Sequence, residues 1–443
     1  MVHMDNCPEF LLTYFACAEL GAVAVCTNTK SSVAELSYFG DHASVVAAVT
    51  QAELLADLEQ AIPQARWIAS TPGQLTNPAM SFDELMRFDP DPHSEKLDRM
   101  TPLSIQYTSG TTARPKAVMW THANALFGAK TSAQHESLTG GDIHLVHLPL
   151  FHTNAQMYSI LASLWVGATA VLQPRFSASR FWDVALRHRC TWSSVVPFCV
   201  KALAEQGEAP RHQFRLWGSG VACPAEDGLF GVRTIGWFGM TETVSHCTVD
   251  DPEHPGRPYG MGRPASEYGV RLVGEDGLPV GLEEVGNLEV FGTPGVSLFA
   301  GYLDDPAATA GSYTEDGWFM TGDLARLHPD GHLSFAGRSK DMLKVGGENV
   351  AAAEVEAVIA SVVGVSEAAV VARGDDMLHE VPVAFVIASQ PSIGLAELIK
   401  ARCMDQLASF KVPREIRFVE EFPRSTLNKV AKAKLRSLLS DTP

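Results

Sequence analysis

The sequence of 443 residues lacks several features that mark other classes of protein. Its eight cysteines form no Cys-x-x-Cys pair and show no metal-ligand spacing, which predicts reduced, mostly buried thiols. No apolar run is long enough to span a bilayer, and the start lacks a basic-then-apolar signal, so the cytoplasm is the expected compartment. Cations are few: 34 Lys and Arg against 51 Asp and Glu leave a net charge of -17, which disfavours nucleic acids and anionic membranes as partners.

The composition is that of a large globular protein. With 46% hydrophobic and 19% charged residues, the chain can bury a sizeable core and is expected to form two or more domains. Strand-like apolar runs alternate with helical patterns, which predicts α/β layers. The strands are expected at residues 45–49, 103–107, 168–172, 192–196 and 234–238, and the helices at residues 8–20, 54–61, 123–134 and 179–188.

The pattern changes twice toward the carboxyl end. Between residues 268 and 330, short β runs broken by Gly-Pro, Asp-Gly and Gly-Leu-Pro turns predict a small distorted barrel or sheet. After residue 337 a compact α+β unit is expected. Its helices are predicted at residues 352–361, 395–407 and 430–439, and its strands at residues 368–372, 381–388 and 416–419.

Residues 107–116 (YTSGTTARPK) have the character of a phosphate-binding loop. Ser109, Thr111 and Thr112 offer hydroxyls, and Gly110 allows backbone N–H groups to turn toward an anion. Lys116 adds a mobile positive charge. The spacing differs from that of a P-loop NTPase, which has two glycines and then Gly-Lys-Ser/Thr at the start of a helix.

Five further blocks follow in order: residues 148–152 (LPLFH), 236–243 (GWFGMTET), 317–323 (GWFMTGD), 337–350 (GRSKDMLKVGGENV) and 423–429 (PRSTLNK). Together the six blocks resemble those of the adenylate-forming superfamily, which contains acyl- and aryl-CoA synthetases, peptide-synthetase adenylation domains and beetle luciferases. The resemblance covers nearly the whole chain. It implies a large α/β lobe over residues 1–337 that carries the ATP and acyl sites, a hinge at 338–341 and a small mobile α+β domain over 342–443.

The resemblance also implies a nucleotide site. The phosphate loop and Lys116 would hold the β- and γ-phosphates of ATP, Thr241 would contact the α-phosphate, and Glu242 would hold Mg²⁺. Asp323 would accept hydrogen bonds from the ribose hydroxyls, with Arg338 as a second contact. The full expected set is Thr108, Ser109, Gly110, Thr111, Thr112, Lys116, Gly218, Ser219, Gly220, Trp237, Phe238, Gly239, Met240, Asp323 and Arg338, in which Phe238 stacks on adenine.

By the same resemblance, Lys429 is the principal catalytic residue of the small domain and bridges the acid and the α-phosphate. The domain would then turn about Asp341 and present a thiol channel that includes Lys344, Gly346, Gly347 and Glu348. The Lys-x-Gly-Gly-Glu-Asn-Val pattern is similar to that of acyl- and aryl-CoA synthetases, so CoA is the expected acceptor. A carrier-protein thiol is the alternative acceptor.

His152 resembles the histidine of CoA ligases, including the crotonobetaine and carnitine kind, that lies between the acyl pocket and the nucleotide, and it is expected to be catalytic. The acyl pocket would be lined by Phe151, Asn154, Val195, Trp217 and His246. Bulky Trp217 and Trp237 suggest a short or flat acid. The sequence does not name the acid.

Three departures from the family pattern leave other readings open. Ala113 and Ala117 stand where glycine is common, and an alanine costs about 1 kcal/mol or more wherever φ must be positive. Asn428 replaces the usual glycine before Lys429, which is a mild change because Asn tolerates left-handed backbone. The amino end is short for the family, either naturally or because its start was assigned or cloned late. If residues are missing, an unpaired sheet edge and an exposed apolar face are expected, and low solubility or a homodimer that covers the edge would follow. A weakly active paralogue that binds nucleotide or acyl-adenylate is the second alternative.

Overall fold

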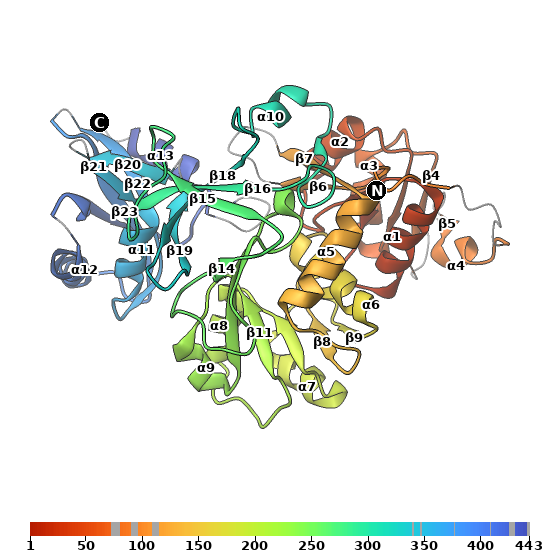
Figure 1. Cartoon of the computed structure of the whole chain (residues 1–443), viewed down its shortest axis with the longest axis horizontal. Helices are drawn as coiled ribbons and strands as arrows, with labels where there is room; N and C mark the ends of the chain where they lie inside the picture. The colour runs from red at the N-terminus through yellow and green to blue at the C-terminus, as the bar shows by residue number, and fades with distance from the viewer. Residues whose placement is uncertain are drawn as a thin grey trace. The chain divides into compact units, whose positions relative to one another are not determined.

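The computed structural model describes residues 1–71, 80–89, 96–108, 115–338, 341–345, 348–375, 377–407, 409–424 and 430–440. The chain forms two compact units (Figure 1). The first unit is Met1–Arg271, Glu289–Phe319 and His328–Ser334, and the second is Leu272–Leu288, Met320–Leu327 and Phe335–Pro443. The second unit therefore takes in segments ahead of the boundary expected at residue 337, and the hinge at 338–341 stays a prediction.

The amino-terminal sheet has eight strands in the order β17-β7-β6-β2-β1-β3-β4-β5. Neighbours from β6 to β5 pair in parallel, whereas β7 and β17 pair antiparallel. The first strand lies between β2 and β3, so this strand is not an edge of the sheet. The strands are β1 (Val2–His3), β2 (Ala24–Cys26), β3 (Ala47–Thr50), β4 (Trp67–Ser70), β5 (Met80–Ser81), β6 (Pro102–Thr108), β7 (Lys116–Thr121) and β17 (Gly301–Tyr302).

Local sequence explains where the helices around this sheet begin. Pro8 occupies the first turn of α1, where its missing N–H is not needed. Ser32 and Glu35 form a capping box at the start of α2. The predicted helix over residues 8–20 is confirmed. The helices are α1 (Pro8–Leu20), α2 (Val33–His42), the 3₁₀ turn η1 (Ala52–Leu54), α3 (Leu55–Ala61) and α4 (Phe82–Leu85).

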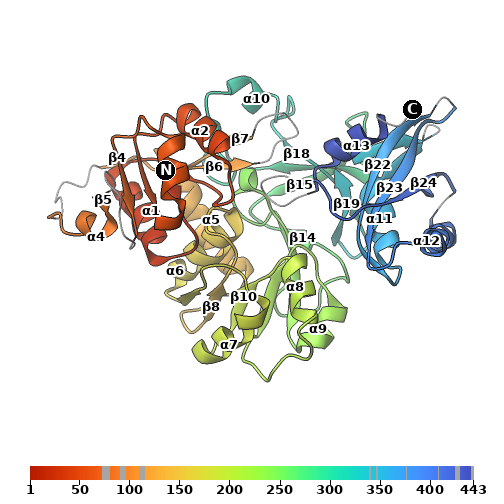
Figure 2. The ribbon, with the colours of Figure 1, turned by 180° about the vertical axis from the view of Figure 1, so that it is seen from behind.

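The second sheet has seven strands in the order β14-β13-β12-β11-β10-β8-β9. Its parallel strands have apolar side chains on both faces, because helices cover both (Figures 1 and 2). The strands are β8 (Ile143–Val146), β9 (Thr169–Leu172), β10 (Trp192–Ser194), β11 (Leu216–Ser219), β12 (Arg233–Phe238), β13 (Thr248–Val249) and β14 (Arg263–Pro264). One face packs against α5 (His122–His135), the π-helix η2 (Asn154–Leu161) and α6 (Ala162–Val166), and the other against α7 (Ala178–His188), α8 (Pro197–Ala204) and α9 (Pro224–Phe230).

The region expected to be a small barrel or sheet forms a four-stranded sheet in the order β15-β16-β18-β19. Its strands are β15 (Gly269–Val273), β16 (Val285–Phe291), β18 (Phe319–Leu327) and β19 (Leu333–Arg338), and the short helix α10 (Pro306–Ala310) lies between β17 and β18 in the chain.

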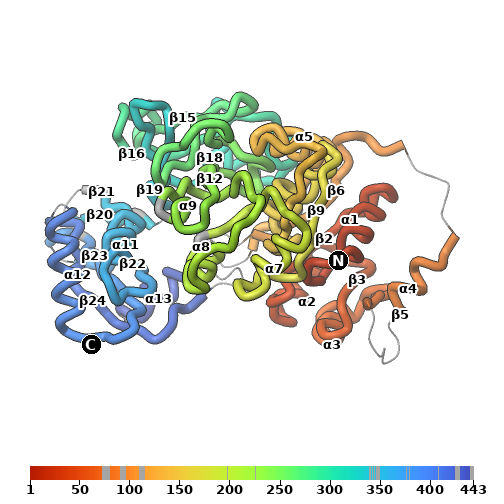
Figure 3. Tube along the Cα trace, turned by 90° about the horizontal axis from the view of Figure 1, so that it is seen from below, coloured from red at the N-terminus to blue at the C-terminus, as the bar shows by residue number. Residues whose placement is uncertain are grey.

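The carboxyl-terminal part is the predicted α+β unit (Figure 3). Val355 and Ile359 of α11 pack with Ile399 of α12 in one apolar cluster, whereas Leu435 of α13 packs with Phe385 in another. The elements are β20 (Met342–Val345), β21 (Glu348–Ala351), α11 (Ala352–Ala360), β22 (Val365–Asp375), β23 (His379–Ala388), α12 (Ile393–Gln406), the 3₁₀ turn η5 (Ser409–Lys411), β24 (Glu415–Phe418) and α13 (Lys432–Ser440). None of the helices in the described ranges is long and apolar enough to cross a membrane.

Candidate functional site

The hairpin of β6 and β7 brings together the two ends of the expected phosphate loop. Thr108 pairs with Lys116 in the ladder, and the Thr108 hydroxyl donates to the Lys116 carbonyl over 3.5 Å. Ala117 follows in β7, is buried and has no positive φ, so the expected cost of alanine there does not arise. The predictions for Ser109, Gly110, Thr111, Thr112 and Ala113 lie outside the described residues.

Lys116 and Glu242 both interact with Tyr302, a residue that the sequence patterns did not single out. The Lys116 Nζ lies 4.4 Å from the centre of the Tyr302 ring. The Tyr302 hydroxyl donates to Glu242 Oε1 over 3.0 Å, and the Phe299 N–H donates to the Glu242 carbonyl over 2.8 Å. Glu242 is 5% exposed. Tyr302 thus contacts both Lys116, which is expected to bind phosphate, and Glu242, which is expected to hold Mg²⁺.

Thr241, the expected α-phosphate contact, ends a chain of buried hydrogen bonds. The Thr153 and Thr241 hydroxyls lie 3.1 Å apart, and the Thr153 hydroxyl lies 3.0 Å from Gln106 Oε1. Gln106 Nε2 donates to Gln156 Oε1 over 2.8 Å, which leaves Gln106 Oε1 as the acceptor for Thr153. Thr153 is the donor toward both oxygens, so its single proton is shared between Gln106 Oε1 and the Thr241 hydroxyl. Thr153 therefore links the Thr241 hydroxyl to the buried amide of Gln106.

The backbone of Thr241 is fixed separately. The indole N–H of Trp120 in β7 donates to the Thr241 carbonyl over 2.9 Å. Nothing in the local pattern around Thr153, Gln106 or Trp120 indicated these contacts, because each joins residues far apart in the chain.

The expected adenine-binding residues lie at the ends of β11 and β12. The two strands pair in parallel, with Gly218 opposite Ile235 and Ser219 opposite Gly236. A Cβ on Gly218 would lie 1.6 Å from the Trp237 ring, so only glycine lets the indole lie against this strand. Phe238 is half-buried, and Gly220 is exposed with open space around it. Gly239, like Gly218, has no room for a side chain, since a Cβ there would lie 2.5 Å from the Tyr158 hydroxyl.

The expected ribose contacts meet within the second unit. Arg338 Nε lies 3.0 Å from Asp323 Oδ1, and the Asp323 side chain is 4% exposed. The Asp323 N–H donates to the Thr321 hydroxyl over 3.1 Å, which fixes the turn that carries the carboxylate. Asp341, the expected hinge residue, pairs with Arg436 at 3.2 Å and with Lys432 at 3.9 Å.

The two tryptophans expected to shape the acyl pocket lie on opposite faces of the second sheet. Trp217 is fully buried toward α7 and α9, with its ring centre 5.7 Å from that of Phe181 and 5.3 Å from that of Phe230. Trp237 packs instead with Tyr158 on the face covered by α5 and η2. The two indoles therefore lie on different faces of the sheet, and the place of Trp217 in the acyl pocket stays a prediction. Trp217, like Val195, belongs to the core beneath the sheet.

His246 belongs to the face that carries Trp237. Its ring stacks on Trp237 with centres 4.2 Å apart and lies 4.0 Å from the Tyr158 ring. Burial lowers the pKa of His246 well below its usual value, and burial raises the pKa of the facing Glu136 well above its usual value. Burial thus disfavours the charged form of both side chains, which lie 4.0 Å apart.

The remaining acyl-side predictions lie at the start of η2. His152 is half-buried, with its ring 4.6 Å from that of Phe151. Within the described chain, Asn154 Oδ1 is buried and has no hydrogen-bond partner. π-helical segments are frequent at functional sites, and the eight-residue π-helix η2 begins at Asn154.

The thiol channel is described only in part. Lys344 and Glu348 belong to the paired strands β20 and β21, where Val345 lies opposite Glu348. Gly346, Gly347, Asn428 and the catalytic candidate Lys429 lie outside the described residues. Their roles stay predictions.

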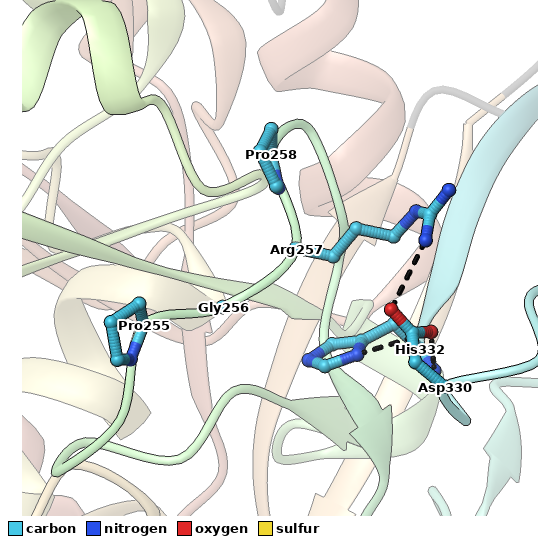
Figure 4. A pocket seen from close by; sticks show the side chains of 6 residues that line it. All are labelled: Pro255, Gly256, Arg257, Pro258, Asp330 and His332. Atoms are coloured by element: carbon cyan, nitrogen blue, oxygen red, sulfur yellow. Dashed lines mark hydrogen bonds and ion pairs between the residues drawn. The ribbon is translucent and has the colours of Figure 1, made fainter.

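A surface cavity of about 480 Å³ contains none of the expected site residues. It is lined by Pro255, Gly256, Arg257, Pro258, Asp330 and His332 (Figure 4). Arg257 is paired with Asp330 at 3.0 Å, and His332 lies between Asp330 and the buried Asp250, 3.3 Å from each. Arg257 and His332, which line this cavity, therefore each lie next to a carboxylate of the protein itself.

The residues present fit a magnesium ion bound together with a nucleotide. The described chain contains no cluster of three or more His, Cys, Asp or Glu that would hold a metal alone. Glu242, which follows Thr241 in the chain, instead offers a single buried carboxylate, and Mg²⁺ is commonly bound by one or two carboxylates plus phosphate oxygens.

Comparison with known proteins agrees with this geometry. Residues 1–303 match the family model described as AMP-binding enzyme, and residues 354–429 match the AMP-binding enzyme C-terminal domain. A crotonobetaine/carnitine–CoA ligase from Proteus mirabilis (strain HI4320) is 32% identical over 456 residues, which cover 98% of this chain and 87% of the relative.

Two solved structures show the likeness in three dimensions. An anthranilate CoA ligase in complex with anthranoyl-AMP superposes with a TM-score of 0.90 at 27% identity, covering 99% of this chain and 87% of the other. An o-succinylbenzoate coenzyme A synthetase from Bacillus subtilis, in complex with ATP and a magnesium ion, superposes with a TM-score of 0.84 at 30% identity, covering 99% and 88%.

Proposed function

The chain belongs to the AMP-binding enzyme family, and we propose that it is an ATP-dependent acid–CoA ligase that makes an acyl-adenylate and then an acyl-CoA. The observation that carries the proposal is the cluster of Lys116, Tyr302 and Glu242, which joins a cation and a buried carboxylate beside Thr241. The related CoA ligases support CoA as the acceptor. Transfer to a carrier-protein thiol and assembly as a homodimer stay predictions.

The reaction has two steps. A carboxylate oxygen of the acid attacks the α-phosphorus of ATP, and the bond to pyrophosphate breaks. The thiol sulfur of CoA then attacks the acyl carbon, and AMP leaves. Positioning and neutralisation of charge supply most of the acceleration in the first step.

Each side chain would have a separate role in the first step. Lys116 would neutralise the outer phosphates, and the Thr241 hydroxyl would contact the α-phosphate. Glu242 would hold Mg²⁺, which offsets negative charge on the phosphates when bound. Lys429 would bridge the acid and the α-phosphate.

The second unit would hold the sugar of the nucleotide. Asp323 is held by its turn and paired with Arg338, and its carboxylate oxygens can accept hydrogen bonds from ribose hydroxyls. Phe238 and the backbone of residues 218–220 would enclose the adenine.

We expect the acid to be small. Trp237, Tyr158 and His246 fill the space behind Gly239 and Gly218, so a long acyl chain would have to displace buried rings. The names of the relatives, which include crotonobetaine, carnitine and anthranilate, fit a short or flat acid.

The acid pocket can be tested with two tryptophans. Trp237→Ala should broaden the range of acids toward longer chains, whereas Trp217→Ala should leave acid preference unchanged and reduce the free energy of unfolding by about 3–5 kcal/mol. Initial rates over a series of acids of increasing length, together with denaturant unfolding, would measure both. Equal changes in acid preference for the two variants would refute this assignment of the pocket.

The function itself is tested by incubating the protein with Mg²⁺, ATP, CoA and a panel of carboxylic acids, followed by mass spectrometry for AMP and acyl-CoA. A new thioester that is absent with Glu242→Gln supports the proposal and identifies the acid. AMP or acyl-adenylate without thioester would favour a carrier protein, to be checked by adding a phosphopantetheinyl protein. No AMP with any acid would contradict ligase activity.

A further inference from the structure

Tyr302 is held rigidly by its backbone. In β17, Tyr302 pairs with Val118 and Gly301 pairs with Met119 of β7, two and three residues after Lys116. The Tyr302 N–H also donates to the Thr309 hydroxyl over 2.9 Å. The strand that begins with Lys116 therefore also fixes the position of Tyr302.

The ring of Tyr302 is fixed as well. Its centre lies 4.8 Å from that of Phe299, and the Phe299 N–H donates to the Glu242 carbonyl. The segment from Phe299 to Tyr302 thus holds Glu242 at two points, by its main chain and by its carboxylate. The carboxylate has little freedom to turn independently of β7.

The phenol that donates to the carboxylate is neutral. A tyrosine hydroxyl is uncharged at neutral pH and donates its proton to Glu242. A neutral donor orients the carboxylate without cancelling its charge, whereas a lysine or arginine at this place would compete with a bound cation.

We propose that Tyr302 is the positioning residue of the Mg²⁺ site, with its hydroxyl orienting Glu242 and its ring orienting Lys116. One side chain then sets the metal ligand and the phosphate-binding cation relative to each other. Partners that orient metal ligands typically change metal affinity by about 10- to 100-fold when removed. This inference rests on the proposed function, because it takes Glu242 as the metal ligand and Lys116 as the phosphate contact.

The chain offers a matched control. Tyr313 belongs to the same aromatic cluster, with its ring stacked on Phe299 at 6.4 Å and 5.6 Å from Phe319. The hydrogen bond to Glu242, however, comes from Tyr302. Tyr302→Phe and Tyr313→Phe therefore each remove one phenol oxygen from the same aromatic cluster. Of the two, Tyr302→Phe is the one that removes the hydrogen bond from Tyr302 to Glu242.

The experiment measures metal binding directly. Mn²⁺ is titrated into the protein in the presence of AMP, and free Mn²⁺ is followed by electron paramagnetic resonance. Tyr302→Phe should weaken Mn²⁺ binding by about tenfold or more. Tyr313→Phe should stay within about twofold of the unchanged protein, and in a Glu242→Gln background Tyr302→Phe should have no further effect.

A second readout separates the hydroxyl from the ring. In pyrophosphate exchange, Tyr302→Phe should raise the Mg²⁺ concentration needed for half-maximal rate and leave the KM for ATP nearly unchanged at saturating Mg²⁺. Tyr302→Leu removes the ring over Lys116 and should raise the KM for ATP as well. Normal thermal unfolding of Tyr302→Phe would confirm that the change is local.

The outcomes are distinguishable. If the unchanged protein binds Mn²⁺ and AMP but Tyr302→Phe binds Mn²⁺ equally well, this inference is overturned and the proposed function stands. If the unchanged protein binds neither, the proposed function fails and this inference fails with it.

Discussion

Glu242 in the first unit and Asp323 in the second are both buried carboxylates, 5% and 3% exposed, but their partners differ. Glu242 accepts from the neutral phenol of Tyr302, whereas Asp323 pairs with the guanidinium of Arg338. In the proposed site, Glu242 would attract a cation, and a neutral donor orients it without cancelling its charge. Asp323 would accept hydrogen bonds from sugar hydroxyls, and a nearby guanidinium favours the ionised form of a carboxyl.

Glu136 is a third buried carboxylate, and its surroundings differ from those of the other two. It is fully buried, and neither of its oxygens has a hydrogen bond of ordinary geometry within the described chain. Burial raises its pKa well above the usual value, and the nearby Arg215 and Trp192 offset this only in part. The three carboxylates are thus similarly buried but differ in the groups that face them.

The largest expected effect comes from removing the charge of Glu242. Glu242→Gln should lower kcat/KM for adenylation on the order of 1000-fold, because the ligand of a metal that stabilises the transition state is worth several kcal/mol. Pyrophosphate exchange would measure the loss, and thioester formation from supplied acyl-adenylate should be far less affected. A loss below about tenfold would mean that Glu242 is not the metal ligand.

Asp323→Asn should have an intermediate effect. Hydrogen bonds to a charged group contribute about 1.5–3 kcal/mol, so the KM for ATP should rise by about 10- to 100-fold while the KM for the acid changes little. Asp316→Asn is the control, since it removes a surface carboxylate that also pairs with an arginine, Arg271. Equal effects of the two substitutions would remove Asp323 from the nucleotide site.

The smallest effect is expected at Glu136 and depends on pH. A carboxyl whose pKa is raised in the folded state stabilises the fold fully below its ordinary pKa of 4.5, and this stabilisation is lost as pH rises through the raised value. Glu136→Gln avoids that loss, so it should raise the midpoint of thermal unfolding by about 1 °C or more at pH 8 and have no effect near pH 4. Thermal scans at the two pH values would test this, and lower stability of the variant at pH 8 would show that Glu136 is charged in the fold.

Much of the fold was predictable because its signals are local. Hydrophobic periodicity indicated the strand that contains Leu103 and the helix that contains Ala123, and the Asp323 and Glu242 blocks indicated the nucleotide site. Tyr302 was not predictable, because its role depends on β17 joining β7 as an antiparallel neighbour, and a two-residue strand has no periodic signal of its own. The sequence likewise could not show whether Ala117 needs a positive φ; pairing across the hairpin keeps that residue extended, so the cost does not arise.

By itself the sequence determined the family, the alternation of strands and helices, and the charged candidates for a nucleotide site, because these depend on residue type and short-range order. Only the tertiary structure decided that Trp217 and Trp237 face opposite sides of one sheet, and that Tyr302 joins Lys116 to Glu242. A parallel strand that is buried on both faces is apolar at every position, so its sequence does not indicate which side chain faces which helix layer. Contacts between distant segments likewise arise only when the sheets form.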